Sequence, residues 1–155
     1  MRGTTLGIEA GSKFAPLIPA ILKMKNHDIK WCRVEFYGCG DSGSIESVEF
    51  DKDPPEELKI RVEKPNFEMK FDADKGRYIR TVHPNTVEFM PIQSGIEDIV
   101  YQMLDDESVD WYNNEGGGGH LEIDLRSDKP GIEFHVYYNE IVSTSAVSDF
   151  EELRL

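Results

Sequence analysis

The chain lacks the features that define several protein classes. Its 155 residues include only two cysteines, Cys32 and Cys39, and no pair of Cys-x-x-Cys motifs, which excludes a disulfide scaffold and a four-cysteine zinc site. The longest apolar stretch, Phe14–Leu22, has nine residues, whereas a helix needs about 20 to span a bilayer. We therefore expect no membrane association and, with both cysteines reduced, a cytoplasmic protein.

Basic residues are scarce in the second half of the chain. The sequence has 17 Lys and Arg against 30 Asp and Glu, a formal net charge of −13. Residues 1–86 hold 14 of each sign, so the whole excess lies in residues 87–155, where three basic residues face 16 acidic ones. An acidic field repels nucleic acid and attracts cationic surfaces. We expect no direct binding of duplex nucleic acid and a partner with a basic surface, unless the charge serves only solubility.

Apolar periodicity predicts a single α+β domain over residues 1–155. Helical spacing appears over residues 15–26 and 95–105, and Ser94 with Glu97 resembles a capping box at the start of the second helix. Period-two alternation predicts strands over residues 30–37, 45–50, 58–62, 67–71, 78–82, 121–125 and 132–138. Residues 83–85, His-Pro-Asn, are expected to turn the chain. We expect an antiparallel sheet of meanders and hairpins packed against one or two helices. Residues 1–12 are expected to be a loose lead-in, and residues 143–155 a flexible tail with a helical turn at 150–153.

The segment Gly38–Gly43 matches the nucleotide-binding pattern G-x-G-x-x-G and follows a strand. In that motif the glycines must open a helix whose amides hold the pyrophosphate. Here the following residues alternate like a strand, so a tight hairpin loop that needs glycine explains the pattern better. We expect no nucleotide and no other cofactor.

Four consecutive glycines, Gly116–Gly119, follow the segment Trp111–Glu115. One interpretation is a mobile flap that carries Asn114, Glu115 and His120 over a pocket. The other is a plain flexible linker between the helix and the last hairpin.

Chemistry-bearing residues are otherwise scattered. If the last hairpin pairs as its alternation suggests, His120, Glu122, His135 and Tyr137 form a patch on one face. With Asp41 or Asp110 nearby this patch could hold a metal, but no metal-ligand spacing supports that, and exposed positions on a half-solvated sheet are the simpler interpretation. No nucleophile elbow, phosphate-binding loop or catalytic cysteine motif is present. We assign no catalytic residue and no metal, and expect a protein that is not an enzyme.

Two segments together resemble an uncharacterised family of small acidic proteins from bacteria, phages and mobile elements. They are the Gly40-Asp41-Ser42-Gly43 loop after the first strand and the Trp111-x-Asn113-Asn114-Glu115-Gly116 turn after the helix. The resemblance covers residues 30–140. It implies that Asp41, Ser42, Asn113, Asn114 and Glu115 belong to one polar rim at one end of the sheet, but it implies no known activity.

These observations favour an interaction protein, an inhibitor or adaptor of bacterial or phage origin, that binds a basic surface of a protein partner. Its candidate contact residues are Asp41, Ser42, Asn113, Asn114, Glu115, His120, Glu122 and His135. Mimicry of DNA by the acidic face is a special case, which predicts competition with duplex DNA for one partner. The alternative is a module or enzyme that binds a small molecule or metal between the loops 38–43 and 113–120.

Overall fold

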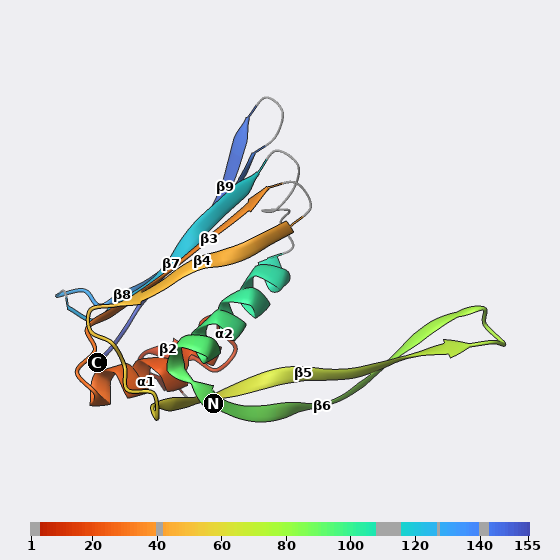
Figure 1. The fold of residues 1–155 in the computed structure, drawn as a ribbon, viewed down its shortest axis with the longest axis horizontal. Coiled ribbons are helices and arrows are strands. Elements are labelled where there is room, and N and C mark those ends of the chain that lie inside the picture. The colour runs from red at the N-terminus through yellow and green to blue at the C-terminus, as the bar shows by residue number, and fades with distance from the viewer. Residues whose placement is uncertain (1–3, 40–41, 108–115, 127, 140–142) are drawn as a thin grey trace.

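Strands dominate the structure, a computed structural model that describes residues 4–39, 42–107, 116–126, 128–139 and 143–155 (Figure 1). A small hairpin, a 3₁₀ turn and a helix come first: β1 (Thr4–Thr5), β2 (Ile8–Glu9), η1 (Ala15–Leu17) and α1 (Ile18–Asn26). The remaining elements are β3 (Trp31–Cys39), β4 (Ser42–Phe50), β5 (Lys59–Asp72), β6 (Arg77–Pro91), α2 (Ile92–Glu107), β7 (Gly117–Asp124), β8 (Gly131–Asn139) and β9 (Thr144–Glu152).

Five of the strands form one antiparallel sheet with the order β4-β3-β7-β8-β9. The chain leaves this main sheet after β4, builds β5, β6 and α2, and returns as β7 on the other side of β3. The pairing of β3 with β7 therefore joins residues almost 90 positions apart, such as Arg33 and Glu122. The expected hairpins β3–β4 and β7–β8 are both present.

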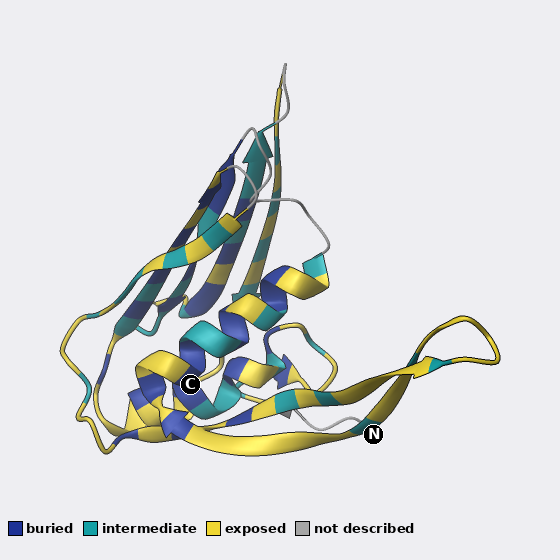
Figure 2. Cartoon of the chain, turned by 45° about the vertical axis from the view of Figure 1, so that its right-hand side comes forward, coloured by how far each residue is buried: buried dark blue, intermediate teal, exposed yellow. Residues whose placement is uncertain are grey.

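Helix α2 lies between the main sheet and the β5–β6 hairpin (Figure 1). Its apolar residues recur every three or four positions, which gathers them on one stripe. The buried members are Ile92, Gly95, Ile96, Ile99, Val100, Met103 and Leu104. They share one core with Cys32, Val34 and Phe36 of β3 and with Ile60 and Val62 of β5. Figure 2 shows the buried residues concentrated where the sheet, α1 and α2 meet.

Strands β5 and β6 form a two-stranded hairpin of their own, which projects from the body (Figure 1). Only its base is buried, through Ile60, Val62 and Met90. The register shifts between Lys64 and Asn66, and beyond that irregularity the strands are exposed (Figure 2). We call this hairpin, residues 59–91, the arm.

Three sequence expectations about local structure were wrong. Helix α2 begins at Ile92, so Ser94 lies inside its first turn and is not the residue that caps the helix. Residues 83–85 were expected to turn the chain, but they lie within β6 at the register shift, where an irregular pairing accommodates Pro84. A helical turn was expected at residues 150–153, but residues 150–152 are the end of edge strand β9, and Leu153 follows the strand. Pairing with β8 outweighs the local helix preference here.

The expected fold class is confirmed: the protein is an α+β domain built on an antiparallel sheet with two α-helices. Residues 4–9 form the small β1–β2 hairpin, and Ile8 is fully buried. Within the described ranges, neither α-helix is long and apolar enough to cross a membrane.

The contact between α2 and the base of the arm gives a stability prediction. A Cβ atom built on Gly95 would lie 2.6 Å from Ile60 Cδ1, so a large side chain cannot fit there. Gly95→Leu should lower the free energy of unfolding by about 1–3 kcal/mol through overpacking. The neighbouring exposed residue Gln93 provides the control. Urea unfolding followed by circular dichroism should show little change for Gln93→Leu, and equal losses for the two variants would contradict this packing.

Candidate functional site

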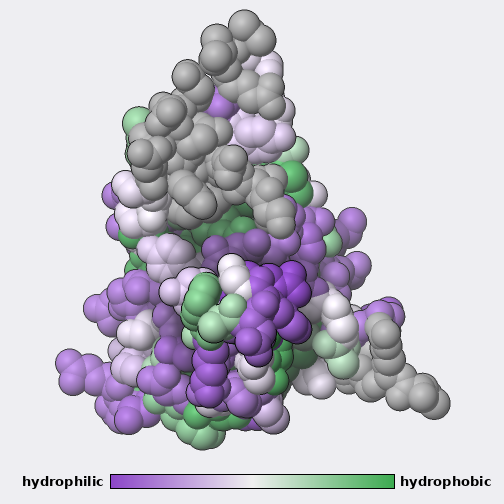
Figure 3. Space-filling view, turned by 90° about the vertical axis from the view of Figure 1, so that its right-hand side faces the viewer, coloured by the Kyte–Doolittle hydropathy of each residue, from purple (hydrophilic) through white to green (hydrophobic). Residues whose placement is uncertain are grey.

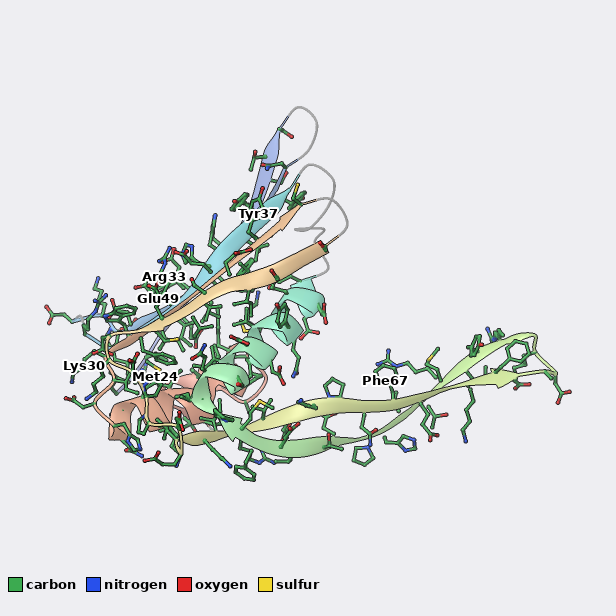
Figure 4. The ribbon with its side chains drawn as sticks, in the orientation of Figure 1. Met24, Lys30, Arg33, Tyr37, Glu49 and Phe67 are labelled. Carbon is green, nitrogen blue, oxygen red and sulfur yellow. The ribbon has the colours of Figure 1, made fainter. Side chains whose placement is uncertain are left out.

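One face of the main sheet is left uncovered by the helices. Because side chains alternate along a strand, burial of Cys32, Val34 and Phe36 against the core turns their neighbours outward. Figure 4 shows Arg33, Tyr37 and Glu49 on the side of the sheet away from α2. We define the open face by these residues and the partners that the strand register gives them: Trp31, Arg33, Glu35, Tyr37, Glu49, His120, Glu122, Asp124, Glu133, His135, Tyr137, Ser148 and Phe150.

A histidine pair lies in the middle of the open face. His120 is directly opposite His135, and their ring centroids are 5.7 Å apart. The Ser148 hydroxyl hydrogen-bonds with His135 Nδ1, and His120 Nε2 lies 3.4 Å from Glu133 Oε1. The register thus confirms that His120, Glu122, His135 and Tyr137 share one face; their role in binding stays a prediction.

Two arginines form hydrogen bonds with carboxylates of this face. Arg33 Nε donates to Glu35 Oε1 at 2.8 Å, and Arg33 Nη1 donates to Glu122 Oε2 at 3.1 Å. The hydrogen bond to Glu35 comes first among the causes that raise the pKa of Arg33 above its usual value. Arg126 forms two 3.1 Å hydrogen bonds with Asp124, which lower the pKa of that carboxyl group. The guanidinium of Arg126 also lies 5.6 Å from the ring centroid of Trp31.

Negative charge is in excess on the open face and along its margins. Among the described residues, seven carboxylates lie there with three cations, Arg33, Arg126 and Lys129. The carboxylates belong to Glu35, Glu46, Glu49, Glu122, Asp124, Glu133 and Glu152. Because the cations are outnumbered, a cationic surface can approach this face favourably.

Two tyrosines frame a shallow pocket at one end of the open face. Tyr37 and Tyr137 are both directly opposite Gly118, on β3 and β8 respectively. A Cβ atom on Gly118 would lie 3.3 Å from the Tyr137 hydroxyl and 2.5 Å from the Phe36 carbonyl oxygen, so a side chain at this position would be too close to both neighbouring strands. The pocket has a volume of about 310 Å³, and Glu35 and Glu46 also line it. Aromatic rings beside carboxylates suit a cationic group.

Three of the four glycines are part of the sheet, which neither expectation for the run foresaw. Gly117, Gly118 and Gly119 belong to β7 and pair with β3 and β8, so these three are not a flexible linker, and His120 lies on a strand and not on a flap. A Cβ atom on Gly119 would overlap the His135 carbonyl oxygen, and its φ is +153°. Close approach of the neighbouring strands therefore requires glycine here, although glycine usually weakens a strand.

The loop residues expected to form a polar rim are mostly outside the described residues. Asp41, Asn113, Asn114 and Glu115 fall there, as does Asp110. Ser42 is exposed and pairs with Cys39 across the hairpin. The described ends of both loops do lie together, since Gly38 is opposite both Gly43 and Gly117.

The geometry does not support a nucleotide or metal site among the described residues. The glycines at 38 and 43 pair with each other within a hairpin, and the following element is strand β4, not a helix. No three His, Cys, Asp or Glu side chains of the described part of the chain lie close enough to hold a metal ion.

Sequence reasoning missed the contribution of β3 to the open face. Arg33, Glu35 and Tyr37 lie opposite Glu122, His120 and Gly118. Their outward orientation follows from the alternation with Cys32, Val34 and Phe36. Their contact with β7 cannot be inferred from this alternation, because strands that are distant in sequence carry no local signal of their pairing.

The two cysteines differ in a way that alkylation can test. Cys32 is fully buried, and burial raises its pKa to about 12, whereas Cys39 at the end of β3 is exposed. Since the thiolate is the reactive form, iodoacetamide should add one group to the folded protein and two in urea, as read by mass spectrometry. In a Cys39→Ser variant the folded protein should remain unmodified; rapid labelling of Cys32 there would contradict the structure.

Comparison with known proteins places the chain in a family without giving it an activity. No curated protein and no solved structure matches it significantly. One family profile, described as a family of unknown function (DUF6878), matches residues 18–151, which include α1, α2, the arm and almost all of the main sheet. The chain belongs to this family of unknown function.

Proposed function

We propose that this protein is a non-enzymatic interaction module whose open face binds a basic surface of a protein partner. The observation that carries the proposal is a sheet face that the described helices leave uncovered. On this face and along its margins seven carboxylates outnumber three cations, and aromatic rings lie beside them. Tyrosine and tryptophan are enriched in protein interfaces, and charged residues are common at their rims.

The open face is better suited to an external cation than the other acidic regions. Near the end of α2, Lys13 Nζ lies 2.7 Å from both Glu107 and Asp149. Burial alone would lower the pKa of Lys13, but its hydrogen bonds to these carboxylates raise it above its usual value. Both of these carboxylates are therefore already paired with a cation of the chain itself. On the open face the three cations leave a surplus of carboxylates.

The tyrosine pocket supplies a specific contact within this surface. Tyr37 is 49% exposed, and Glu35 beside it makes one of the two bonds to Arg33. A lysine or arginine side chain of the partner would place its charge between the carboxylates and its alkyl chain against the two rings. A small cationic molecule in the same pocket is the second candidate, favoured by the pocket's position beside the described ends of the two glycine loops.

The biological context is also a proposal. A bacterial, phage or mobile-element inhibitor or adaptor fits the small size and acidic charge, and it follows from the resemblance of the two loop motifs alone. An acidic face that imitates DNA remains one form of the same idea, since DNA-binding proteins present basic surfaces.

A basic peptide tests the proposed surface without knowledge of the natural partner. We expect an arginine-rich decapeptide to bind the protein at low ionic strength and to be released at high salt, as isothermal titration calorimetry would record. Glu122→Gln/Glu133→Gln should weaken this binding at least about fivefold. The control variant Asp105→Asn/Asp106→Asn removes the same charge from the exposed end of α2 and should have a much smaller effect.

Equal weakening by the two variants would show attraction to net charge only and would reject the open face as the site. Amide chemical shifts in the same titration distinguish the two candidates. A basic protein surface should perturb the amides of β3, β7 and β8 together, whereas a small cation such as an arginine derivative should perturb only the pocket residues, such as Tyr37, Gly119 and Tyr137. Salt-independent peptide binding would contradict the electrostatic mechanism.

A further inference from the structure

The outer part of the arm has an exposed apolar face. Cross-strand pairs share a face of a hairpin, and three consecutive alternate pairs are Phe67 with Val82, Met69 with Arg80, and Phe71 with Tyr78. The five apolar side chains among them are 48–72% exposed. Figure 4 shows Phe67 on the part of the arm that extends away from the helices.

The side chains of this face contact one another across the two strands of the arm. The rings of Phe71 and Tyr78 meet edge to face, with centroids 5.3 Å apart, and the guanidinium of Arg80 lies 4.4 Å from the Phe67 ring centroid. The opposite face carries Glu68 and Lys70, whose charged groups are 3.6 Å apart. Figure 3 views the molecule from the arm's end, and both hydrophobic and hydrophilic residues appear on the central projection. The outer arm is therefore amphipathic, although no other part of the described chain covers it.

The exposed apolar area is large for a free surface. Three aromatic side chains of about 150–250 Å² each, each roughly half exposed, contribute about 300–350 Å², and Met69 and Val82 add to this. Monomeric proteins rarely expose apolar patches larger than a few hundred Å². A stable interface buries roughly 600–1,000 Å² on each partner, so these five side chains account for a substantial part of one.

The charge distribution indicates what covers the patch. Residues 59–91 carry seven basic and five acidic residues, whereas the rest of the chain carries ten basic and 25 acidic residues. Two bodies of this chain therefore repel each other, but the arm of one copy is attracted to the body of another. When two arms lie antiparallel, each tip points toward the partner's body, so this arrangement brings opposite net charges together.

We infer that the arm is a dimerisation element, in which the face formed by Phe67, Met69, Phe71, Tyr78 and Val82 packs against the same face of a second copy. The contact is isologous and antiparallel, with Met69 near the two-fold axis because it lies between Phe67 and Phe71 on β5. It also explains how an isolated two-stranded hairpin, which is marginally stable in water, is maintained beyond the core. This inference concerns a surface separate from the open face.

Sedimentation equilibrium of the full chain tests the dimer. At about 100 µM, above the roughly micromolar dissociation constant expected of a small interface, the mass should be twice 17.7 kDa. Phe67→Ser/Phe71→Ser should raise the dissociation constant at least about thirtyfold. The control Lys70→Ser/Thr81→Ser alters the opposite face of the arm and should leave the dimer intact. A monomer of 17.7 kDa for the unaltered chain, or equal effects of the two variants, would overturn the inference.

Cysteine cross-linking tests the arrangement without disturbing the aromatic residues. In a Cys39→Ser background, Met69→Cys should form a disulfide-linked dimer rapidly under mild oxidation, and the adjacent Lys70→Cys on the opposite face should not. Equal cross-linking of the two would overturn the face-to-face arrangement. High salt should not dissociate a dimer held by apolar contacts. It should, however, release the basic peptide from the open face. The two proposals can therefore fail independently, and the salt dependence shows which of them has failed.

Discussion

The apolar stripe of α2 is the contact on which the rest of the structure depends. Ile92, Ile96, Ile99 and their neighbours bury themselves between the main sheet and the base of the arm. Burial of this stripe removes one sheet face from water and fixes the arm through Ile60 and Val62. Among the described residues, the two α-helices cover neither the other sheet face nor the outer arm, so both surfaces can contact other molecules.

These two surfaces differ in the interaction that each can supply. On the open face, carboxylates outnumber cations and Arg33 joins two neighbouring strands, so association there depends on charge and is screened by salt. On the arm, Phe67 and Phe71 lie in a segment with a small basic excess, so association depends mainly on the removal of apolar area from water. The chain thus separates its acidic surface from its apolar one along the molecule (Figure 1).

Close packing of strands explains the most unusual segment of the sequence. Gly118 and Gly119 lie in the central strand of the main sheet, where the backbones of β3 and β8 approach from either side. A run of glycines in a sequence suggests a loop because glycine has a high conformational entropy when unfolded. Here the tertiary constraint outweighs that entropy, and Gly119 also lines the tyrosine pocket.

The sequence by itself determined the local elements: the stripe of α2, the β3–β4 and β7–β8 hairpins, and the sharing of one face by His120, His135 and Tyr137. Periodicity and short connections carry that information, because neighbours in the chain pair over short loops. Only the tertiary structure decided that β7 pairs with β3, which brings Arg33 to Glu122 and Tyr37 to Gly118. It also decided that the β5–β6 hairpin leaves the main sheet as an arm, since alternation predicts a strand without stating which sheet it joins.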